Sequence, residues 1–231
     1  MLPNAPLDPA YKIYRLSTVD QVAALLREKI VTGELRPGTA LAEVSLSKKI
    51  GVSRNTMREA IRVLVYEGLV QHSVRRGVSV TSLRLADVTD IYRVRVRLEL
   101  DALDATRDAT PEEIATLDIA KEIAKAHEAS DWNAVVEWDM TFHRRLVGFL
   151  KSARLSQFYR TLLSELRLGL VLVDRTEADG ARLVSEHAEL YELVRSGRLE
   201  ECKAALRDHL ARSEQNVVHI LRTSGNTETA E

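Results

Sequence analysis

No proline follows Pro111 in this chain of 231 residues, and Pro37 is the only proline between Pro9 and Pro111. Inside a helix, proline removes a backbone hydrogen bond and clashes with the preceding turn, so a long proline-free stretch is compatible with long helices. Apolar residues recur at helical spacing throughout that stretch. The sequence therefore predicts a mainly α fold in which the chain after residue 83 is almost entirely helical.

Polar and glycine-containing breaks divide the helical region into six predicted segments of about 16 to 25 residues each. The predicted breaks are residues 109–111, 130–131, 151–152, 179–180 and 196–197. At the first of them, Thr110 precedes Pro111 and Glu113, the pattern of a capping box with proline at the first helical position. We therefore expect a helix to begin there.

Charge is distributed unevenly along the chain. Residues 1–80 hold 12 Lys/Arg and 7 Asp/Glu, a net charge of +5, which leaves 21 basic and 27 acidic residues, a net charge of −6, for residues 81–231. A basic N-terminal part is expected if only that part contacts a polyanion. Uneven surface charge without a binding role would give the same totals.

The first 80 residues predict a winged helix-turn-helix. A helix is expected from Ser17 to Gly33, and two short helices, 43–50 and 54–67, flank a turn that contains Gly51. Two apolar-polar stretches follow and predict a β-hairpin with a basic tip. The tip residues are Arg75, Arg76 and Gly77.

The second short helix carries candidate DNA contacts near its N-terminus. Its apolar residues share one side, so Arg54, Asn55 and Arg58 project from the other, where side chains can pair with base edges. Hydroxyls at the helix start can hold a phosphate, and a basic wing tip can reach the backbone or minor groove. Solvated surface arginines are the alternative interpretation. The candidate set is Ser53, Arg54, Asn55, Thr56, Arg58, Arg75, Arg76 and Gly77.

Three motifs in this region resemble the N-terminal domain of the GntR superfamily of bacterial transcription regulators. They are TGELRPG at 32–38, GVSRNTMREA at 51–60 and EGLV at 67–70. The resemblance covers residues 15–82. It places the recognition positions on Ser53, Arg54, Asn55, Thr56 and Arg58, and the wing glycine on Gly77. Some branches carry a DNA-contacting arginine where this chain has Val44, so the second helix is expected to contribute less here.

Four residues of the helical region form a candidate metal site. Asp139 and His143 are one turn apart on one helix face, and His187 and His209 lie on two later predicted helices. Three imidazoles and a carboxylate suit Zn²⁺, Ni²⁺, Mn²⁺ or Fe²⁺ and leave coordination positions for an oxygen ligand. Packed or surface histidines would give the same spacing, which is our interpretation of His72, His127 and His219.

The helical region also resembles the FCD effector domain of the FadR-like branch. Its motifs are RVRLE at 95–99, DMTFH at 139–143, SEH at 185–187 and DHL at 208–210. The resemblance covers residues 85–222 and implies an antiparallel bundle. The six expected helices correspond to the shorter, VanR-type version. It also implies a divalent metal, zinc first, at Asp139, His143, His187 and His209. Ser152 stands where many members have asparagine after the third helix.

The resemblance implies that a small carboxylate binds at the metal and modulates the affinity for an operator. Arg95 would pair with the charge of this effector, although a salt bridge with Glu99 one turn away is an alternative role for it. The implied protein is a homodimeric, DNA-binding transcription regulator that acts on double-stranded operator DNA. Two other classes stay open at this point. One is a constitutive dimeric DNA-binding protein with a structural helical domain, and the other is a metallohydrolase, for which we find no general base.

Other features set limits on the class of protein. Cys202 is the single cysteine, which excludes an intramolecular disulfide and a cysteine-rich zinc module. No apolar run reaches the roughly 18 residues that span a bilayer, and residues 1–10 lack the features of a signal peptide. We expect a cytoplasmic protein with no membrane partner. Its expected parts are a tail (1–14), the winged domain (15–82), an effector-binding and dimerisation domain (83–222) and a flexible tail (223–231).

Overall fold

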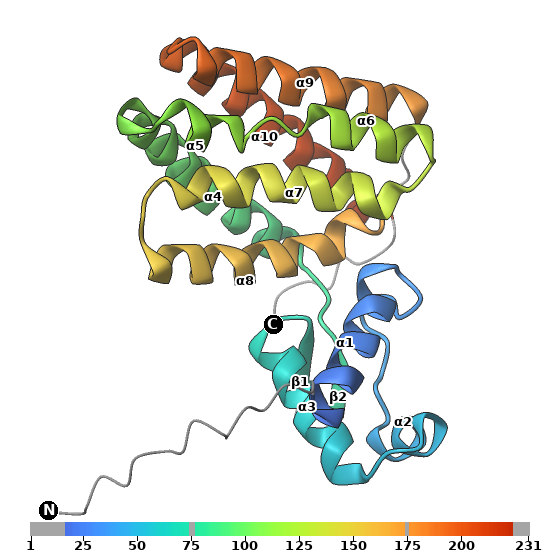
Figure 1. Ribbon diagram of the computed structural model, residues 1–231. Helices are drawn as coiled ribbons and strands as arrows, with labels where there is room; N and C mark the ends of the chain where they lie inside the picture. The colour runs from blue at the N-terminus through green and yellow to red at the C-terminus, as the bar shows by residue number, and fades with distance from the viewer. Residues whose placement is uncertain (1–16, 74–76, 174–175, 224–231) are drawn as a thin grey trace, which may run out of the picture.

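The computed structural model describes residues 17–73, 77–173 and 176–223. Figure 1 shows two parts, a small N-terminal domain with a two-stranded sheet and a larger bundle of helices. The mainly α fold predicted from the sequence is confirmed. The outer parts of the two predicted tails, 1–14 and 224–231, lie outside the described residues.

The N-terminal part, called the winged domain below, has three helices and a hairpin. Its elements are α1 (Thr18–Val31), α2 (Glu43–Ile50), α3 (Arg54–Tyr66), β1 (Val70–Ser73) and β2 (Gly77–Val80). The strands are antiparallel, with Val70 opposite Val80. Gly51 ends α2 with a φ of 78°, a conformation that glycine adopts without steric cost. The helix-turn-helix and the hairpin are therefore formed where the sequence predicts them.

The larger part, called the bundle below, contains long helices and two short ones. Its elements are α4 (Leu85–Ala105), the 3₁₀ helix η1 (Thr106–Asp108), α5 (Pro111–Ala115), α6 (Ala120–Glu128), α7 (Trp132–Gly148), α8 (Ala153–Leu170), α9 (Glu177–Arg195) and α10 (Leu199–Thr223). The expected capping box is present, because Glu113 N–H donates to Thr110 Oγ1 and Thr110 N–H donates to Glu113. None of the helices described is both long and apolar enough to cross a membrane.

Two predicted boundaries differ from the structure. Residues 111–130, predicted as one helix, form α5 and α6 with a turn between them, because Leu117 and Ile119 bury their side chains there. The predicted break at 179–180 lies inside α9. Asp179 is the third residue of a capping box with Thr176, so the acidic side chain begins the helix instead of ending one.

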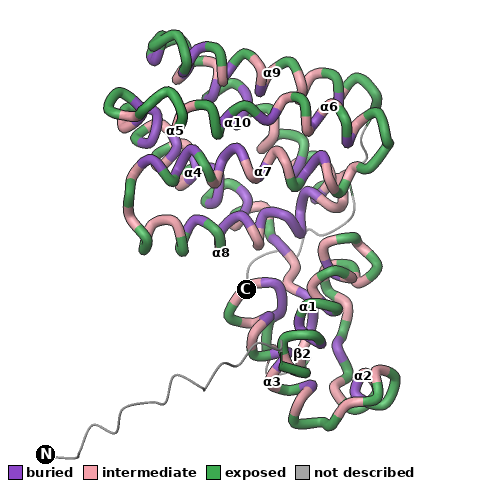
Figure 2. The backbone as a smooth tube through the Cα atoms, viewed as in Figure 1, coloured by how far each residue is buried: buried purple, intermediate pink, exposed green. Residues whose placement is uncertain are grey.

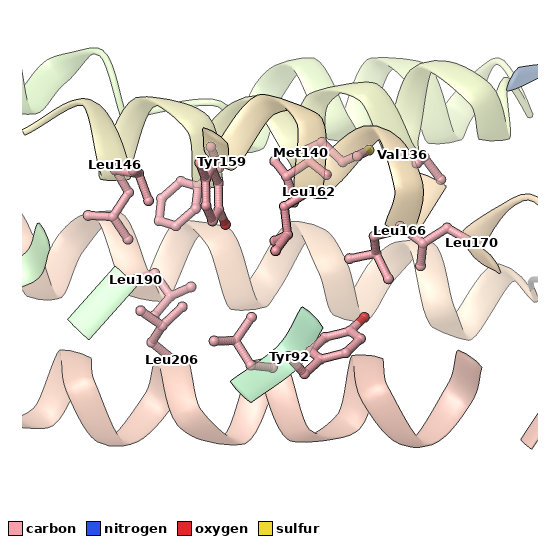
Figure 3. Packing of buried hydrophobic residues seen from close by; sticks show 14 of the residues in the cluster. Tyr92, Val136, Met140, Leu146, Tyr159, Leu162, Leu166, Leu170, Leu190 and Leu206 are labelled. Carbon is pink, nitrogen blue, oxygen red and sulfur yellow. The ribbon is translucent and has the colours of Figure 1, made fainter. Parts of the chain in front are cut away.

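Each part has its own hydrophobic core, and the two cores are joined by α8. Figure 2 shows buried residues along the inward sides of α7 and α8. Five helices of the bundle contribute labelled core side chains in Figure 3, namely Tyr92 (α4), Met140 (α7), Tyr159 (α8), Leu190 (α9) and Leu206 (α10). Leu168, near the end of α8, instead packs in the core of the winged domain and is 1% exposed. The last turns of α8 thus hold the two parts together.

Candidate metal centre and nucleic-acid interface

The structure brings the four predicted metal ligands together inside the bundle. Asp139 and His143 lie on α7, His187 on α9 and His209 on α10. One potential ligand atom from each lies within 4.8 Å of the others. The three histidines are buried, and the Asp139 side chain is 14% exposed. The convergence of three helices that the sequence could only suggest is therefore present in the fold.

In each of the three imidazoles, Nδ1, the ring nitrogen farther from the centre of the cluster, forms a hydrogen bond with an acceptor oxygen. His143 Nδ1 donates to Glu99 Oε2 at 2.6 Å, His209 Nδ1 to Glu186 Oε2 at 2.7 Å, and His187 Nδ1 to the Leu183 carbonyl oxygen at 2.8 Å. Carboxylate and carbonyl oxygens only accept hydrogen bonds, so each Nδ1 carries the proton. In the neutral rings, the three Nε2 atoms therefore present lone pairs to the centre of the cluster.

These lone pairs lie close to one another and to a carboxylate. His143 Nε2 is 3.2 Å from His209 Nε2, and Asp139 Oδ1 is 3.3 Å from His187 Nε2. The buried His187 Nε2 has no hydrogen-bond partner in the described part of the chain. Electron-rich atoms at these separations repel each other unless a proton or a metal ion lies between them. The donor set thus fits a divalent transition metal, with outer partners of the kind that orient metal-ligating histidines.

The charges around the cluster support the same conclusion. Burial lowers the pKa of His187 to about 4, so this imidazole is neutral near neutral pH. Burial opposes ionisation of Asp139, but the three neighbouring histidines outweigh it and hold the pKa of that carboxyl well below its usual range. Burial is the largest influence on His143 and lowers its pKa, but Glu99 and Asp139 together outweigh burial and raise the pKa overall. With neutral histidines, the two carboxylates of Asp139 and Glu99 outnumber the one buried guanidinium of Arg95, and this negative charge favours a bound cation.

Arg95, the candidate effector-binding residue, lies next to this network. It is 2% exposed, and its Nε donates to Glu99 Oε1 at 2.9 Å, so the salt bridge given as its alternative role is formed. The same carboxylate oxygen accepts the Tyr159 hydroxyl at 2.5 Å. Arg95 Nη2 is buried and has no hydrogen-bond partner within the described residues. One donor of the guanidinium thus stays available although the side chain is paired.

Sequence reasoning missed the residues that orient the ligands. Glu99 was considered only as a partner of Arg95, yet it also holds His143. Glu186 was noted only as a neighbour of His187, yet it holds His209, and it is itself paired with Arg212 at 2.9 Å. Glu99 is 44 residues from His143 and Glu186 is 23 residues from His209, so no local spacing links them. Only a polar residue at an otherwise buried helix position could have indicated these roles.

The candidate recognition residues lie around the start of α3. Ser53 is its N-cap, and its Oγ accepts the Thr56 backbone N–H at 3.0 Å. Arg54 and Asn55 are exposed, whereas Arg58 forms a 3.3 Å ion pair with Glu43 of α2. In Figure 1, α2 and the start of α3 lie at the end of the winged domain distant from the bundle. This end can therefore approach a large partner without a clash with the bundle.

The structure describes only part of the predicted wing tip. Gly77 is exposed and begins β2 with a φ of 72°, in the region that glycine adopts readily. Arg75 and Arg76 lie outside the described residues. Val44, at the position where the resemblance expects arginine in some branches, is 44% exposed on α2. An exposed aliphatic side chain there offers no charge to a phosphate.

Comparison with known proteins identifies both parts of the chain. The family model described as bacterial regulatory proteins, gntR family, matches residues 18–80, and the FCD domain model matches residues 90–212. The HTH-type transcriptional regulator YdhC of Bacillus subtilis (strain 168) is 29% identical over 200 residues, which cover 85% of this chain and 89% of that protein. The gluconate operon transcriptional repressor of Bacillus licheniformis is 27% identical over 195 residues, 80% of this chain and 78% of that protein.

The solved structures lead to the same assignment. The putative transcriptional regulator GntR from Rhodococcus sp. RHA1 superposes with a TM-score of 0.77 at 27% identity, covering 88% of this chain and 99% of that one. The matched family models together span both the helix-turn-helix and the ligand cluster. The chain therefore belongs to the gntR family of bacterial regulatory proteins and is a DNA-binding transcriptional regulator whose winged domain is followed by an FCD domain.

Proposed function

We propose that this regulator responds to a small carboxylate metabolite, which binds at a divalent metal in the bundle and changes the affinity of the winged domain for its operator. The protein acts as a homodimer on a near-palindromic site, because one recognition helix reads too few base pairs for selectivity. The single observation that carries the proposal is the buried His187 Nε2, which has no hydrogen-bond partner among the described residues and faces the Asp139 carboxylate.

Asp139, His143, His187 and His209 would hold the metal, with zinc as the first candidate and nickel, manganese and iron as the others. Such an ion would supply a Lewis-acid centre with coordination positions left for an oxygen ligand. The chain's own contribution is orientation. Glu99, Glu186 and the Leu183 carbonyl fix the three rings, so that binding an ion costs little reorganisation.

Arg95 would bind the charge of the effector. Its buried Nη2 has no partner within the described ranges, and a guanidinium donor beside a metal is well suited to a carboxylate. The cavity that reaches His209 and Glu186 has a volume of only about 30 Å³, room for about one water molecule. Leu170 and Val173 line it. An organic acid therefore enters only if the lining elements, which include the end of α8, move apart, and a movement of α8 is the event that binding would couple to DNA affinity.

The position of α8 supports this coupling. Tyr159, in the middle of α8, donates to Glu99, which holds His143. Leu168, nine residues further along the same helix, packs in the core of the winged domain. A rigid helix that contacts both sites transmits a displacement from one to the other.

The test measures operator binding by mobility shift with zinc-loaded protein and a panel of carboxylates that contains gluconate, succinate and citrate. Gluconate is included because a relative is named as the gluconate operon repressor. We expect at least one acid to change the operator affinity of the wild type. We also expect the same acid to leave the operator affinity of His187→Ala unchanged. If no acid has an effect on metal-loaded protein, the bundle only dimerises and the proposed response is wrong.

A further inference from the structure

A second cavity lies between the winged domain and the bundle, and it shares no lining residue with the metal cluster. Its volume is about 400 Å³. One wall comes from α1 and the end of α3, and the other from α7 and α8. The charged residues that line it are Arg27, Glu67, Glu137, Arg144, Arg160 and Arg167.

The charges in this cavity do not balance. Arg27 donates two hydrogen bonds to Glu67, at 2.8 and 2.6 Å. On the bundle side, one carboxylate serves two guanidinium groups, because Glu137 accepts from both Arg144 and Arg167, at 2.5 and 2.6 Å. Four arginines therefore face two glutamates, which leaves an excess of two positive charges.

Two of the arginines have donors that no carboxylate compensates. Arg160 is exposed and donates to the amide oxygen of Gln157, and it forms no ion pair with a carboxylate among the described residues. The Arg167 side chain is only 11% exposed, and its Nε is buried without a hydrogen-bond partner in that part of the chain. Burial lowers the pKa of Arg167, and Glu137 restores it only in part. An anion in the cavity would compensate the positive charges of both guanidinium groups.

The cavity also offers apolar surface. Tyr66, 75% exposed at the end of α3, and Val31, partly exposed at the end of α1, line it together with the almost fully buried Leu69 and Met140. Apolar side chains that line a cavity together with a few convergent cationic donors are typical of sites for small organic anions. Inorganic anions alone would leave the apolar walls uncovered.

We propose that this interdomain cavity binds a small organic anion, with one carboxylate or phosphate group on a short apolar body, and that this anion bridges the two domains. The anionic group would contact Arg160 and Arg167, and the apolar body would lie against Val31 and Tyr66. Arg27 from the winged domain would close the other side. The ligand class is similar to that of the proposed effector, but the residues and the place in the fold are different.

The position of the cavity gives the anion a defined effect. Tyr66 and Glu67, at the end of α3, line it, whereas the start of the same helix lies at the end of the winged domain distant from the bundle (Figure 1). A ligand that contacts both walls favours the domain arrangement in which they lie close together. Because α3 is one rigid element, the arrangement of the two recognition helices of a dimer would become fixed as well.

Isothermal titration calorimetry on the full chain tests the proposal with three probes. Phenyl phosphate and benzoate carry an anionic group on an apolar body, and inorganic phosphate lacks the body. We expect saturable binding of phenyl phosphate, benzoate or both, with about one site per chain, and much weaker binding of inorganic phosphate. The difference between the first two probes identifies the preferred anionic group.

Matched variants assign the binding to the cavity. Arg160→Gln removes the unpaired charge from an exposed position and should weaken binding by roughly fivefold or more. Arg154→Gln, an exposed arginine on α8 outside the cavity lining, should leave it unchanged. Chelation of the metal with EDTA should also leave it unchanged, which separates this site from the proposed effector site.

Three results would overturn the proposal. The first is the absence of saturable heat for both organic probes on wild-type protein. The second is an equal loss of affinity in Arg154→Gln and Arg160→Gln. The third is binding that disappears with EDTA and persists in Arg160→Gln, which would assign the anion to the metal centre.

Discussion

Gly180 of α9 packs directly against the imidazole of His127 on α6. A Cβ atom built on Gly180 would lie 2.0 Å from His127 Cδ2 and 2.3 Å from Nε2. No real side chain tolerates such a separation, so these two helices approach each other only because residue 180 has no side chain. His127 is in turn 3.0 Å from Glu177, one turn earlier on α9.

Gly180→Ala should therefore destabilise the protein although alanine is the better helix former. We expect the free energy of unfolding to fall by about 1–3 kcal/mol, because the helices must separate or His127 must leave its site. Gly148→Ala is the matched control, since nothing lies within 4 Å of the position that a Cβ atom would take there. It should be neutral or raise the free energy by up to about 1 kcal/mol. Urea unfolding followed by circular dichroism measures both, and equal effects of the two substitutions would contradict the packing argument.

The metal centre predicts that purified protein retains about one equivalent of a divalent transition metal, and that chelation lowers its thermal stability. Single alanine substitutions at His143, His187 or His209 should reduce the metal content measured by elemental analysis. His219→Ala serves as the control, because that residue lies on α10 outside the cluster. Wild-type protein that keeps no metal after reconstitution with zinc, nickel or manganese and desalting would disprove the metal site.

Substitution of Glu186 should weaken metal binding without abolishing it. Glu186→Gln weakens the acceptor that fixes His209 but leaves every ligand in place, so we expect about 10- to 100-fold weaker metal binding and not a complete loss. Glu189→Gln, an exposed position on the same helix, controls for the change of charge. Competition with a chromogenic chelator gives the affinities. Identical affinities in the two variants would show that Glu186 has no orienting role.

On the DNA side, Arg54→Ala and Arg58→Ala should each cost about 1–3 kcal/mol of binding to the operator if the side chain reads a base. Arg62→Ala, further along α3 and paired with Glu59, should change little. Arg76→Ala should weaken operator and scrambled DNA alike, as expected for a backbone contact. Mobility shifts on both DNAs provide the measurement. If Arg54→Ala and Arg58→Ala both keep the full operator affinity, the assignment of α3 as the recognition helix is wrong.

The proposed assembly predicts a molar mass in solution close to twice that of one chain. A two-fold symmetric dimer presents two recognition helices to two half-sites, which gives the selectivity that one helix lacks. Light scattering at micromolar concentration, with and without operator DNA, tests this directly. A monomer under both conditions would exclude the dimeric mode of operator binding.

Most of the fold could be predicted from the sequence because its signals are local. Gly33, Gly51 and the capping box at Thr110 mark helix ends within a few residues of the chain, and the structure has ends there. The error at 179–180 has a tertiary origin. Glycine inside a sequence usually indicates a break, but Gly180 is required by the approach of His127, which lies more than 50 residues earlier.

In the candidate metal site, the ligands could be predicted from the sequence, but the residues that orient them could not. The ligands Asp139 and His143 share one helix face, and the residue types of His187 and His209 are unusual on apolar helices, so both could be proposed from sequence. Their partners could not, because Glu99 and Glu186 reach the rings only across the bundle. The role of Arg95 could not be decided from the sequence, which allows either an ion pair with Glu99 or a contact with an effector. In the structure the ion pair is formed. Arg95 Nη2 has no hydrogen-bond partner among the described residues.

Leu168 affects how far the two domains can be treated as interchangeable modules. A fragment that ends at residue 82 would lack the leucine that fills part of the core around Met57 and Leu64. Emptying a buried leucine site typically costs about 2–5 kcal/mol, a large fraction of the stability of a small domain. A chimaera that joins this winged domain to another effector domain must supply an equivalent apolar side chain at the junction. A fusion that supplies such a side chain should be more stable than one whose junction is chosen by the family boundaries alone.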